Sequence, residues 1–120
     1  MSATAYSAVL VVSNNPETLD GLARYLRGAG IAVRGTRALD EAARLGSRSR
    51  TAVVVFPDDY PPPKVRATLA HLKEKDVLTV LVTSDLRAFS TTNTLVLPKP
   101  AWGWTILDAI RDAFVESSGA

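Results

Sequence analysis

The sequence of 120 residues predicts an α/β fold in which helices cover both faces of a parallel β-sheet. Two observations lead to this prediction. Short apolar runs alternate along the chain with segments whose apolar residues recur at helical spacing. The run TAVVVFPDD at residues 51–59 is apolar without alternation until its polar end, which is typical of a strand buried on both faces. We expect about five strands and four helices in one domain, residues 1–120, with a core from about residue 7 to 115.

The first strand and the first helix are marked by a sharp change of residue type. The apolar run at 8–12 ends in a polar stretch in which Asn15 is a good N-cap and Pro16 suits the first helical position. The apolar stripe of the helix consists of Leu19, Leu22, Ala23 and Leu26. Gly28 and Gly30 end the helix.

The middle of the chain continues the alternation of strand and helix. Residues 31–35 alternate in polarity and predict a less buried edge strand, and residues 39–45 predict a short helix. After the central strand, the three prolines at 61–63 predict a stiff extended turn, followed by a helix that runs to about Lys75. The next apolar run, 77–83, predicts a further buried strand.

The last third of the chain contains one segment without a clear element. Residues 84–93 (SDLRAFSTTN) carry no apolar stripe, so they predict a loop with at most one helical turn. Residues 94–97 predict the last strand. The final helix has its core side at Leu107, Ile110 and Phe114.

Composition excludes several classes of function. The chain has no cysteine and one histidine, which excludes disulfides, cysteine nucleophiles, and thiolate or histidine-rich metal sites. Lys and Arg number 14 against 12 Asp and Glu, without a basic run, so we expect no nucleic-acid partner. There is no leader and no apolar run near the roughly 18 residues that span a bilayer, so we expect a cytoplasmic protein without membrane insertion.

Four fragments carry a resemblance to a known family. They are VLVVSNNPE at 9–17, LARYLRGAGIAV at 22–33, LVLPKP at 95–100 and ILDAIRDAF at 106–114. In this order they resemble the receiver domain of bacterial response regulators, the CheY-like family, from about residue 8 to 114. The resemblance implies a flavodoxin-like three-layer fold with the strand order 2-1-3-4-5.

The family's phosphorylation site falls on five positions of this chain, three of which have lost the required side chain. The acidic pair that holds magnesium matches Ser13 and Asn14, and the phosphoryl-accepting aspartate matches Phe56. The phosphoryl-contacting hydroxyl and lysine of the family match Thr83 and Lys99, which survive. Because magnesium prefers carboxylates and an acyl phosphate needs a carboxylate nucleophile, we expect no metal, no cofactor and no enzyme activity.

Two further departures concern the part of the chain between Thr83 and Lys99. These residues are 16 positions apart, about six fewer than the family usually has, and six residues amount to roughly one and a half helical turns. We therefore expect the fourth helix of the family to be shortened or missing. The family's switch aromatic matches Val96, so its coupling to the hydroxyl is lost.

Each remaining candidate has a functional and a structural interpretation. Phe56 is most simply a space filler in the cavity left by the missing carboxylates. Asp58 and Asp59 are either a displaced acceptor site or acidic turn residues that favour solubility, and we prefer the second interpretation. Thr83 and Lys99 are either functional relics or residues that satisfy backbone groups at the strand ends, and again we prefer the structural interpretation.

The predicted interaction surface contains Trp102, Trp104 and Phe89. The tryptophans replace polar residues at the start of the final helix, and exposed tryptophans are typical of interfaces. Alternatively, they fold back over the space of the missing helix. We predict a degenerate receiver, a monomer or weak dimer, that binds signalling proteins without being phosphorylated. The alternatives are a phosphoryl-accepting receiver with its acceptor at Asp58 or Asp59, and a domain taken from a longer sensor or regulator.

Overall fold

The computed structural model describes the backbone of residues 8–44, 51–75, 77–84, 94–99 and 101–119, and the side chains of these residues up to 112. The elements in chain order are β1 (Ala8–Val12), α1 (Pro16–Gly28), β2 (Val33–Thr36), α2 (Leu39–Ala43), β3 (Thr51–Val55), the 3₁₀ turn η1 (Pro57–Asp59), α3 (Pro62–Glu74), β4 (Leu78–Thr83), β5 (Thr94–Pro98) and α4 (Gly103–Gly119).

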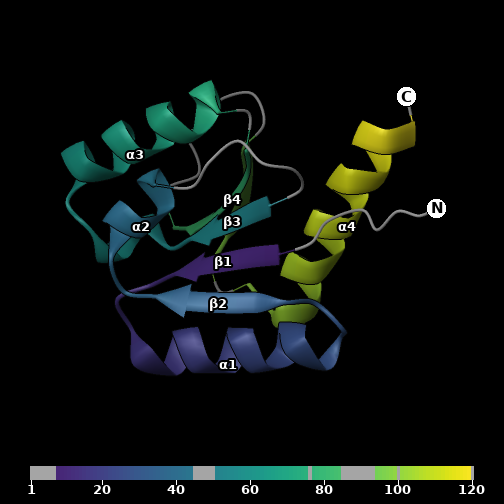
Figure 1. Ribbon diagram of the computed structural model, residues 1–120. Helices are drawn as coiled ribbons and strands as arrows, with labels where there is room; N and C mark the ends of the chain where they lie inside the picture. The colour runs from purple at the N-terminus through teal and green to yellow at the C-terminus, as the bar shows by residue number, and fades with distance from the viewer. Residues whose placement is uncertain (1–7, 45–50, 76, 85–93, 100, 120) are drawn as a thin grey trace.

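The five strands form one parallel sheet in the order β2-β1-β3-β4-β5. Figure 1 shows α1 and α4 on one side of this sheet and α2 and α3 on the other, which gives three layers. The predicted α/β class, the parallel sheet and the strand order 2-1-3-4-5 are therefore confirmed.

Successive residues of each inner strand contribute to two different cores. On β1, Val9 and Val11 join the cluster that faces α1 and α4, whereas Leu10 and Val12 join the cluster that faces α2 and α3. The first cluster also contains Leu22 and Leu26 of α1, and Ile106 and Ile110 of α4. The sheet contributes Val54 of β3, Phe56 directly after β3, and Val80 and Val82 of β4. The second contains Leu39, Ala42, Val53, Val55, Val65, Leu72 and Leu81. Strands buried on both faces explain the unbroken apolar runs in the sequence.

The start of α1 follows the sequence prediction. The Asn15 side-chain oxygen accepts hydrogen bonds from the backbone N–H groups of Glu17 (2.9 Å) and Thr18 (3.2 Å), and Pro16 takes the first helical position. After the helix, Gly30 has φ of 90°, a value that side chains disfavour, and this residue turns the chain back toward the sheet.

Two predicted element boundaries are corrected. β2 begins at Val33 rather than at Ile31, because the Ile31 N–H still bonds to the Leu26 carbonyl (3.1 Å) and its side chain packs in the core. α3 begins at Pro62, within the predicted proline turn. The first N–H groups of a helix have no intrahelical partner, so Pro62 and Pro63 cost nothing there.

The end of the chain agrees with its prediction where the structure describes it. Leu107 and Ile110 of α4 are buried, as is Ile106, which the sequence stripe omitted. The side chain of Phe114 lies outside the described residues, as do Phe89 and the rest of 85–93 where the fourth helix was expected to be shortened or missing. Among the residues that are described, no helix combines the length and the apolar character needed to cross a membrane.

Candidate functional site

Four strands deliver their carboxyl ends to one edge of the sheet. Ser13 follows β1, Phe56 follows β3, Thr83 ends β4 and Lys99 follows β5. All strands are parallel, so these residues meet where sites of open α/β sheets are found. The structure thus brings together the positions that the sequence assigned to a degenerate phosphorylation site.

Phe56 forms the floor of this edge. Its side chain is buried in the core beneath α1 and α4, with 7% of the residue exposed, and its N–H donates to the Val12 carbonyl at 3.0 Å. Phe56 is therefore a core residue, while its expected role of filling the cavity of missing carboxylates stays a prediction. Neither a metal ion nor a phosphoryl group can bond to a phenyl ring.

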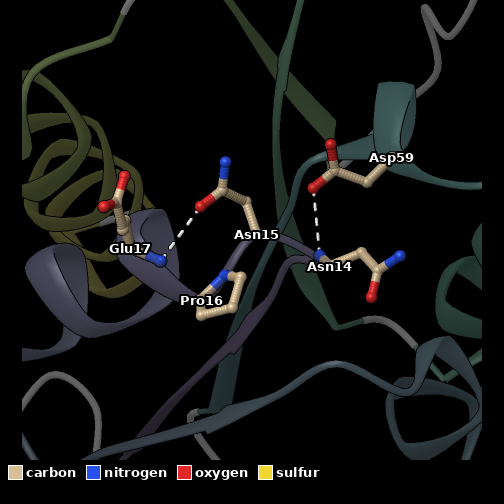
Figure 2. Close-up of a pocket in the computed structure, with 5 residues that line it drawn as sticks. All are labelled: Asn14, Asn15, Pro16, Glu17 and Asp59. Carbon is tan, nitrogen blue, oxygen red and sulfur yellow. Dashed lines mark hydrogen bonds between the residues drawn. The ribbon is translucent and has the colours of Figure 1, made fainter.

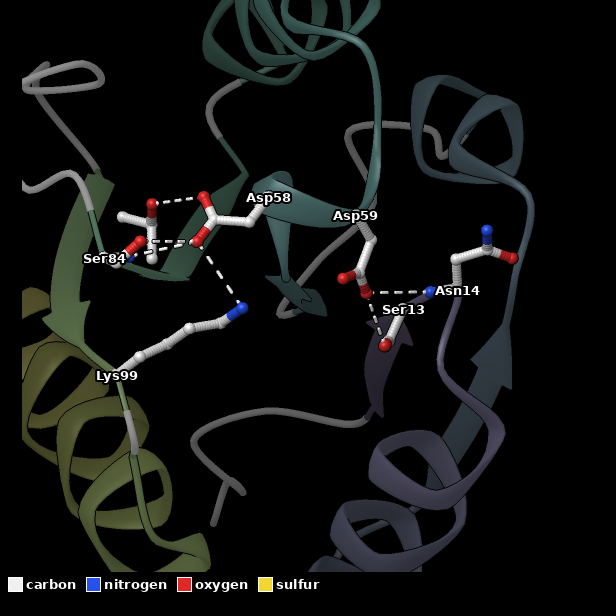
Figure 3. Close-up of polar contacts among 7 residues, drawn as sticks. Ser13, Asn14, Asp58, Asp59, Ser84 and Lys99 are labelled. Carbon is white, nitrogen blue, oxygen red and sulfur yellow. Dashed lines mark hydrogen bonds and ion pairs between the residues drawn. The ribbon is translucent and has the colours of Figure 1, made fainter.

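Directly after Phe56, the chain makes the 3₁₀ turn of Pro57–Asp59. The turn is closed by hydrogen bonds from the Asp59 N–H to the Phe56 carbonyl and from the Tyr60 N–H to the Pro57 carbonyl, both 3.1 Å. Figure 3 shows that Asp58 and Asp59 leave this turn toward opposite sides, Asp58 toward Lys99 and Asp59 toward Ser13.

The Asp58 carboxylate lies among four donors from β4 and β5. Thr83 Oγ1 donates to one oxygen at 2.6 Å, and the other oxygen accepts from the Ser84 N–H (3.1 Å) and the Ser84 hydroxyl (3.0 Å). The Lys99 ammonium lies 3.4 Å from that second oxygen. Partial burial alone raises the pKa of Asp58, but the hydrogen bonds from Thr83 and Ser84, together with Lys99, lower it from 3.8 to about 2. The carboxylate is therefore ionised at neutral pH.

The Asp59 carboxylate is held by neutral donors at the end of β1. One of its oxygens accepts from the Ser13 hydroxyl at 2.8 Å and from the Asn14 N–H at 3.0 Å, a contact drawn in Figures 2 and 3. The fully buried Ser13 hydroxyl in turn accepts from the Asn15 N–H at 3.1 Å. Asp59 thereby ties the 3₁₀ turn to the loop that precedes α1.

Tyr60 and Arg37 anchor the far side of the same region. The Tyr60 hydroxyl donates to the Arg37 carbonyl at 2.9 Å, and the Arg37 side chain donates to the Asn14 side-chain oxygen at 3.2 Å. Burial raises the pKa of Tyr60 to about 12, with a further increase from Asp59 and a decrease from Arg37. Tyr60 therefore stays protonated and acts as a hydrogen-bond donor.

These contacts correct two interpretations made from the sequence. Asp58 and Asp59 are not merely solvating turn residues, because both carboxylates bind to strand ends. Thr83 and Lys99 do not serve backbone groups alone, because both contact Asp58. The sequence signal for this arrangement was the position of the two acids directly after the β3 run, beside two surviving polar residues on neighbouring strands.

The donor set at the end of β1 does not fit magnesium as the fold family holds it. The hollow beside β1 is lined by Asn14, Asn15, Pro16, Glu17 and Asp59 (Figure 2). Asp59 is the carboxylate of this hollow that contacts the end of β1, and it already accepts two hydrogen bonds, from Ser13 and Asn14. Within the described ranges, no three acidic, histidine or cysteine side chains group together as metal ligands.

The two tryptophans lie at the other side of Phe56. Trp102 and Trp104 are 58% and 54% exposed, and their rings stack with centroids 5.3 Å apart and planes 6° from parallel. The Trp102 carbonyl accepts from the Ile106 N–H at 3.1 Å, as expected for the residue before a helix. Both rings are therefore largely exposed. The predicted partner-binding role and the alternative, in which the rings cover the space of the missing helix, both stay predictions, because residues 85–93 lie outside the described residues.

Comparison with solved structures identifies the fold. No protein-family model and no curated protein sequence matches the chain. A response regulator receiver protein from Sinorhizobium medicae superposes with a TM-score of 0.76 at 14% identity, covering 91% of this chain and 94% of that one. The signal receiver domain of an HD domain-containing protein from Pseudomonas fluorescens gives 0.73 at 20% identity, covering 99% and 94%.

A sensor protein from Polaromonas gives a TM-score of 0.68 at 19% identity, covering 92% of this chain and 97% of that one. The chain therefore has the fold of response regulator receiver domains. At these identities the likeness establishes the fold, and function has to be argued from the side chains at the strand ends.

Proposed function

We propose that this domain is a degenerate receiver that binds other signalling proteins in bacterial signal transduction without being phosphorylated. The observation that carries the proposal is the position of Asp58. Its carboxylate lies against Thr83, Ser84 and Lys99, and Thr83 and Lys99 are the residues that the resemblance in sequence matches to the receiver family's phosphoryl contacts. A fixed side chain thus takes the place of a transient modification.

The charge of Asp58 supports a permanent role. With a pKa of about 2, the carboxylate is an anion under all physiological conditions. An anion bonded to a hydroxyl, an N–H group and an ammonium forms charge-assisted hydrogen bonds, which are stronger than neutral ones. Asp58 thus binds Thr83 and Lys99 without any phosphoryl donor.

The other side chains of the site support the absence of phosphotransfer. Phe56 occupies the acceptor position and is buried, and Ser13 and Asn14 bond to Asp59 instead of presenting carboxylates to a metal. The two carboxylates that follow β3, Asp58 and Asp59, are both engaged in hydrogen bonds to neighbouring strand ends. We accordingly infer a non-enzymatic, cytoplasmic interaction module.

Mass spectrometry of the intact protein after incubation with acetyl phosphate and magnesium tests this proposal. We expect the mass to stay unchanged, because the acceptor position carries no carboxylate. The Asp58→Asn and Asp59→Asn variants are the matched controls, since each removes one carboxylate and retains its shape. A gain of one phosphoryl group in the parent chain overturns the proposal.

The geometry also favours a second function, in which Asp58 itself accepts a phosphoryl group. Its carboxylate lies beside the hydroxyl and the lysine that match the family's phosphoryl contacts, and its side chain is 30% exposed. In that reaction a carboxylate oxygen of Asp58 bonds to phosphorus and the bond to the acetate oxygen breaks, releasing acetate. A phosphoryl group found on the parent but not on Asp58→Asn would establish this function.

A further inference from the structure

A groove runs between α1 and the start of α4, on the far side of Phe56 from the two aspartates. It has a volume of about 480 Å³. Its floor is apolar and consists of Leu22, Phe56 and Ile106, all of which belong to the core beneath α1 and α4. The groove is therefore an opening of the core to the surface.

Three exposed aromatic rings line this groove. Tyr25 of α1 is 41% exposed, and it lies opposite the stacked Trp102 and Trp104. A Cβ atom on Gly103 would stand 2.7 Å from the Tyr25 ring, so only glycine allows the ring to lie this close to α4. The described residues contain no other large apolar side chains this exposed, so the exposed aromatic surface is concentrated here.

Gly21 lies within α1 and lines the same groove. Glycine in a helix interior is destabilising relative to alanine, so a glycine there needs a reason. No heavy atom lies within 4 Å of the place that its Cβ would occupy. Packing within the described chain therefore does not require this glycine, and its effect is to keep the groove wide.

Among the described residues, the groove is lined by one carboxylate and by no basic side chain. Glu17 is the only acidic residue that lines it, and the described residues provide no ion pair to its side chain. Arg24, the basic residue of α1 nearest to Glu17 in the sequence, lies about two helical turns after Glu17. It does not line the groove. An unpaired carboxylate beside aromatic faces attracts a cation, because ring faces carry negative charge density.

We propose that this groove binds a segment of a partner protein that presents an arginine or lysine beside an apolar side chain. The apolar side chain lies on Leu22, Phe56 and Ile106, and the cation lies between Glu17 and the aromatic rings. Charge complementarity selects this occupant over an acidic segment. The inference deepens the proposed function, in which the domain is an interaction module, by naming the chemistry of its partner.

Capped tripeptides test the proposal directly. They are Leu-Arg-Leu, its neutral counterpart with citrulline in place of arginine, and Leu-Glu-Leu, each acetylated and amidated. Titrations are followed by tryptophan fluorescence and by the amide NMR signal of Gly21. We expect the arginine peptide to bind about fivefold tighter than the citrulline peptide, and the acidic peptide to bind more weakly than either.

Matched variants separate the groove from the rest of the surface. Gly21→Leu fills the groove and should abolish binding, whereas Gly21→Ala reports whether the helix tolerates a side chain there. Glu17→Gln should reduce the preference for arginine over citrulline to within about twofold. Arg24→Gln, outside the groove, should leave binding unchanged.

Equal binding of the arginine and acidic peptides would overturn the proposal, and so would unchanged binding to a folded Gly21→Leu variant. Signals that shift with protein concentration in the absence of peptide would place a second copy in the groove, which also contradicts it. No phosphoryl donor is present in this experiment. A failure of peptide binding therefore says nothing about phosphorylation. The proposed function is tested separately, by the mass of the protein after incubation with acetyl phosphate.

Discussion

Asp58 and Asp59 are consecutive residues of one 3₁₀ turn, yet they are held by two different kinds of partner. Asp58 faces β4 and β5, where two hydroxyls, an N–H group and the Lys99 ammonium surround it. Asp59 faces β1, where the Ser13 hydroxyl and the Asn14 N–H are its donors. One side of the site is therefore an ionic contact, and the other is a neutral hydrogen-bond contact.

The two aspartates have different partners because different residues stand at the ends of the strands that they face. On the β4 and β5 side, the Asp58 carboxylate accepts from the Thr83 hydroxyl and neutralises the Lys99 ammonium. On the β1 side, Ser13 and Asn14 carry no charge, so the Asp59 carboxylate meets hydrogen-bond donors rather than like charges. We conclude that the polar side chains at the strand ends form one consistent arrangement, in which Asp58 and Asp59 bind the donors of the neighbouring strand ends.

The largest effect on stability is expected at Phe56, the buried residue that directly precedes the turn of Asp58 and Asp59. Phe56→Asp exchanges a buried ring for a carboxylate without a cation beside it, and should lower the free energy of unfolding by about 3–5 kcal/mol. Urea denaturation measures this change. Phe56→Leu, which keeps the site apolar, should cost only about 1 kcal/mol, and an unchanged midpoint for Phe56→Asp would mean that Phe56 is not buried.

Removing each carboxylate separately compares the two sides. Asp58→Ala leaves Thr83 and Lys99 without their anion and should cost about 2 kcal/mol, whereas Asp59→Ala should cost about 1 kcal/mol because its donors are uncharged. Urea denaturation of both variants measures which substitution lowers the free energy of unfolding more. A larger loss for Asp59→Ala would reverse our ranking of the two sides.

The stability of the fold should depend on pH at acidic values, because the pKa of Asp58 is lowered. Its value of about 2 in the folded chain lies below the ordinary 3.8, so the ionised carboxylate stabilises the fold above pH 3.8. That contribution is lost as the pH falls from 3.8 through 2, and amounts to about 1 kcal/mol after solvent screening. Denaturation curves across this window should show a smaller acid loss for Asp58→Asn than for the parent, and parallel curves would contradict this.

The smallest effects on stability are expected at the aromatic groove, which lies outside the site. Trp102→Ala and Trp104→Ala remove exposed, stacked rings and should each lower the free energy of unfolding by less than about 1 kcal/mol. Binding of the arginine peptide should weaken by about tenfold or more. A sharp fall in melting temperature with binding intact would show that the rings support the fold instead.

The sequence predicted the architecture well because its signals were strong and local. The unbroken apolar run at Val53–Val55 predicted a buried strand, and Asn15 predicted the start of a helix. The structure has both. The burial of Phe56 could also be predicted, because this aromatic residue directly follows the apolar run of the third strand.

The contacts of Asp58 and Asp59 could not be predicted in the same way. They depend on a three-residue 3₁₀ turn, whose tight geometry sends consecutive side chains in different directions. They also depend on residues 25 and 46 positions away in the sequence, brought close only by the parallel sheet. Composition and periodicity describe neither the turn nor these pairings.

The most direct test of the account is the pKa of Asp58, measured by NMR titration of its side-chain carboxyl carbon. We predict a midpoint of about 2 in the parent chain, because the carboxylate is bound by Thr83, Ser84 and Lys99. In the Lys99→Met and Thr83→Val variants, the midpoint should rise toward 3.8, since each removes one group that favours the anion. A midpoint at or above 3.8 in the parent, unchanged by either substitution, would show that Asp58 is not bound by Thr83, Ser84 and Lys99.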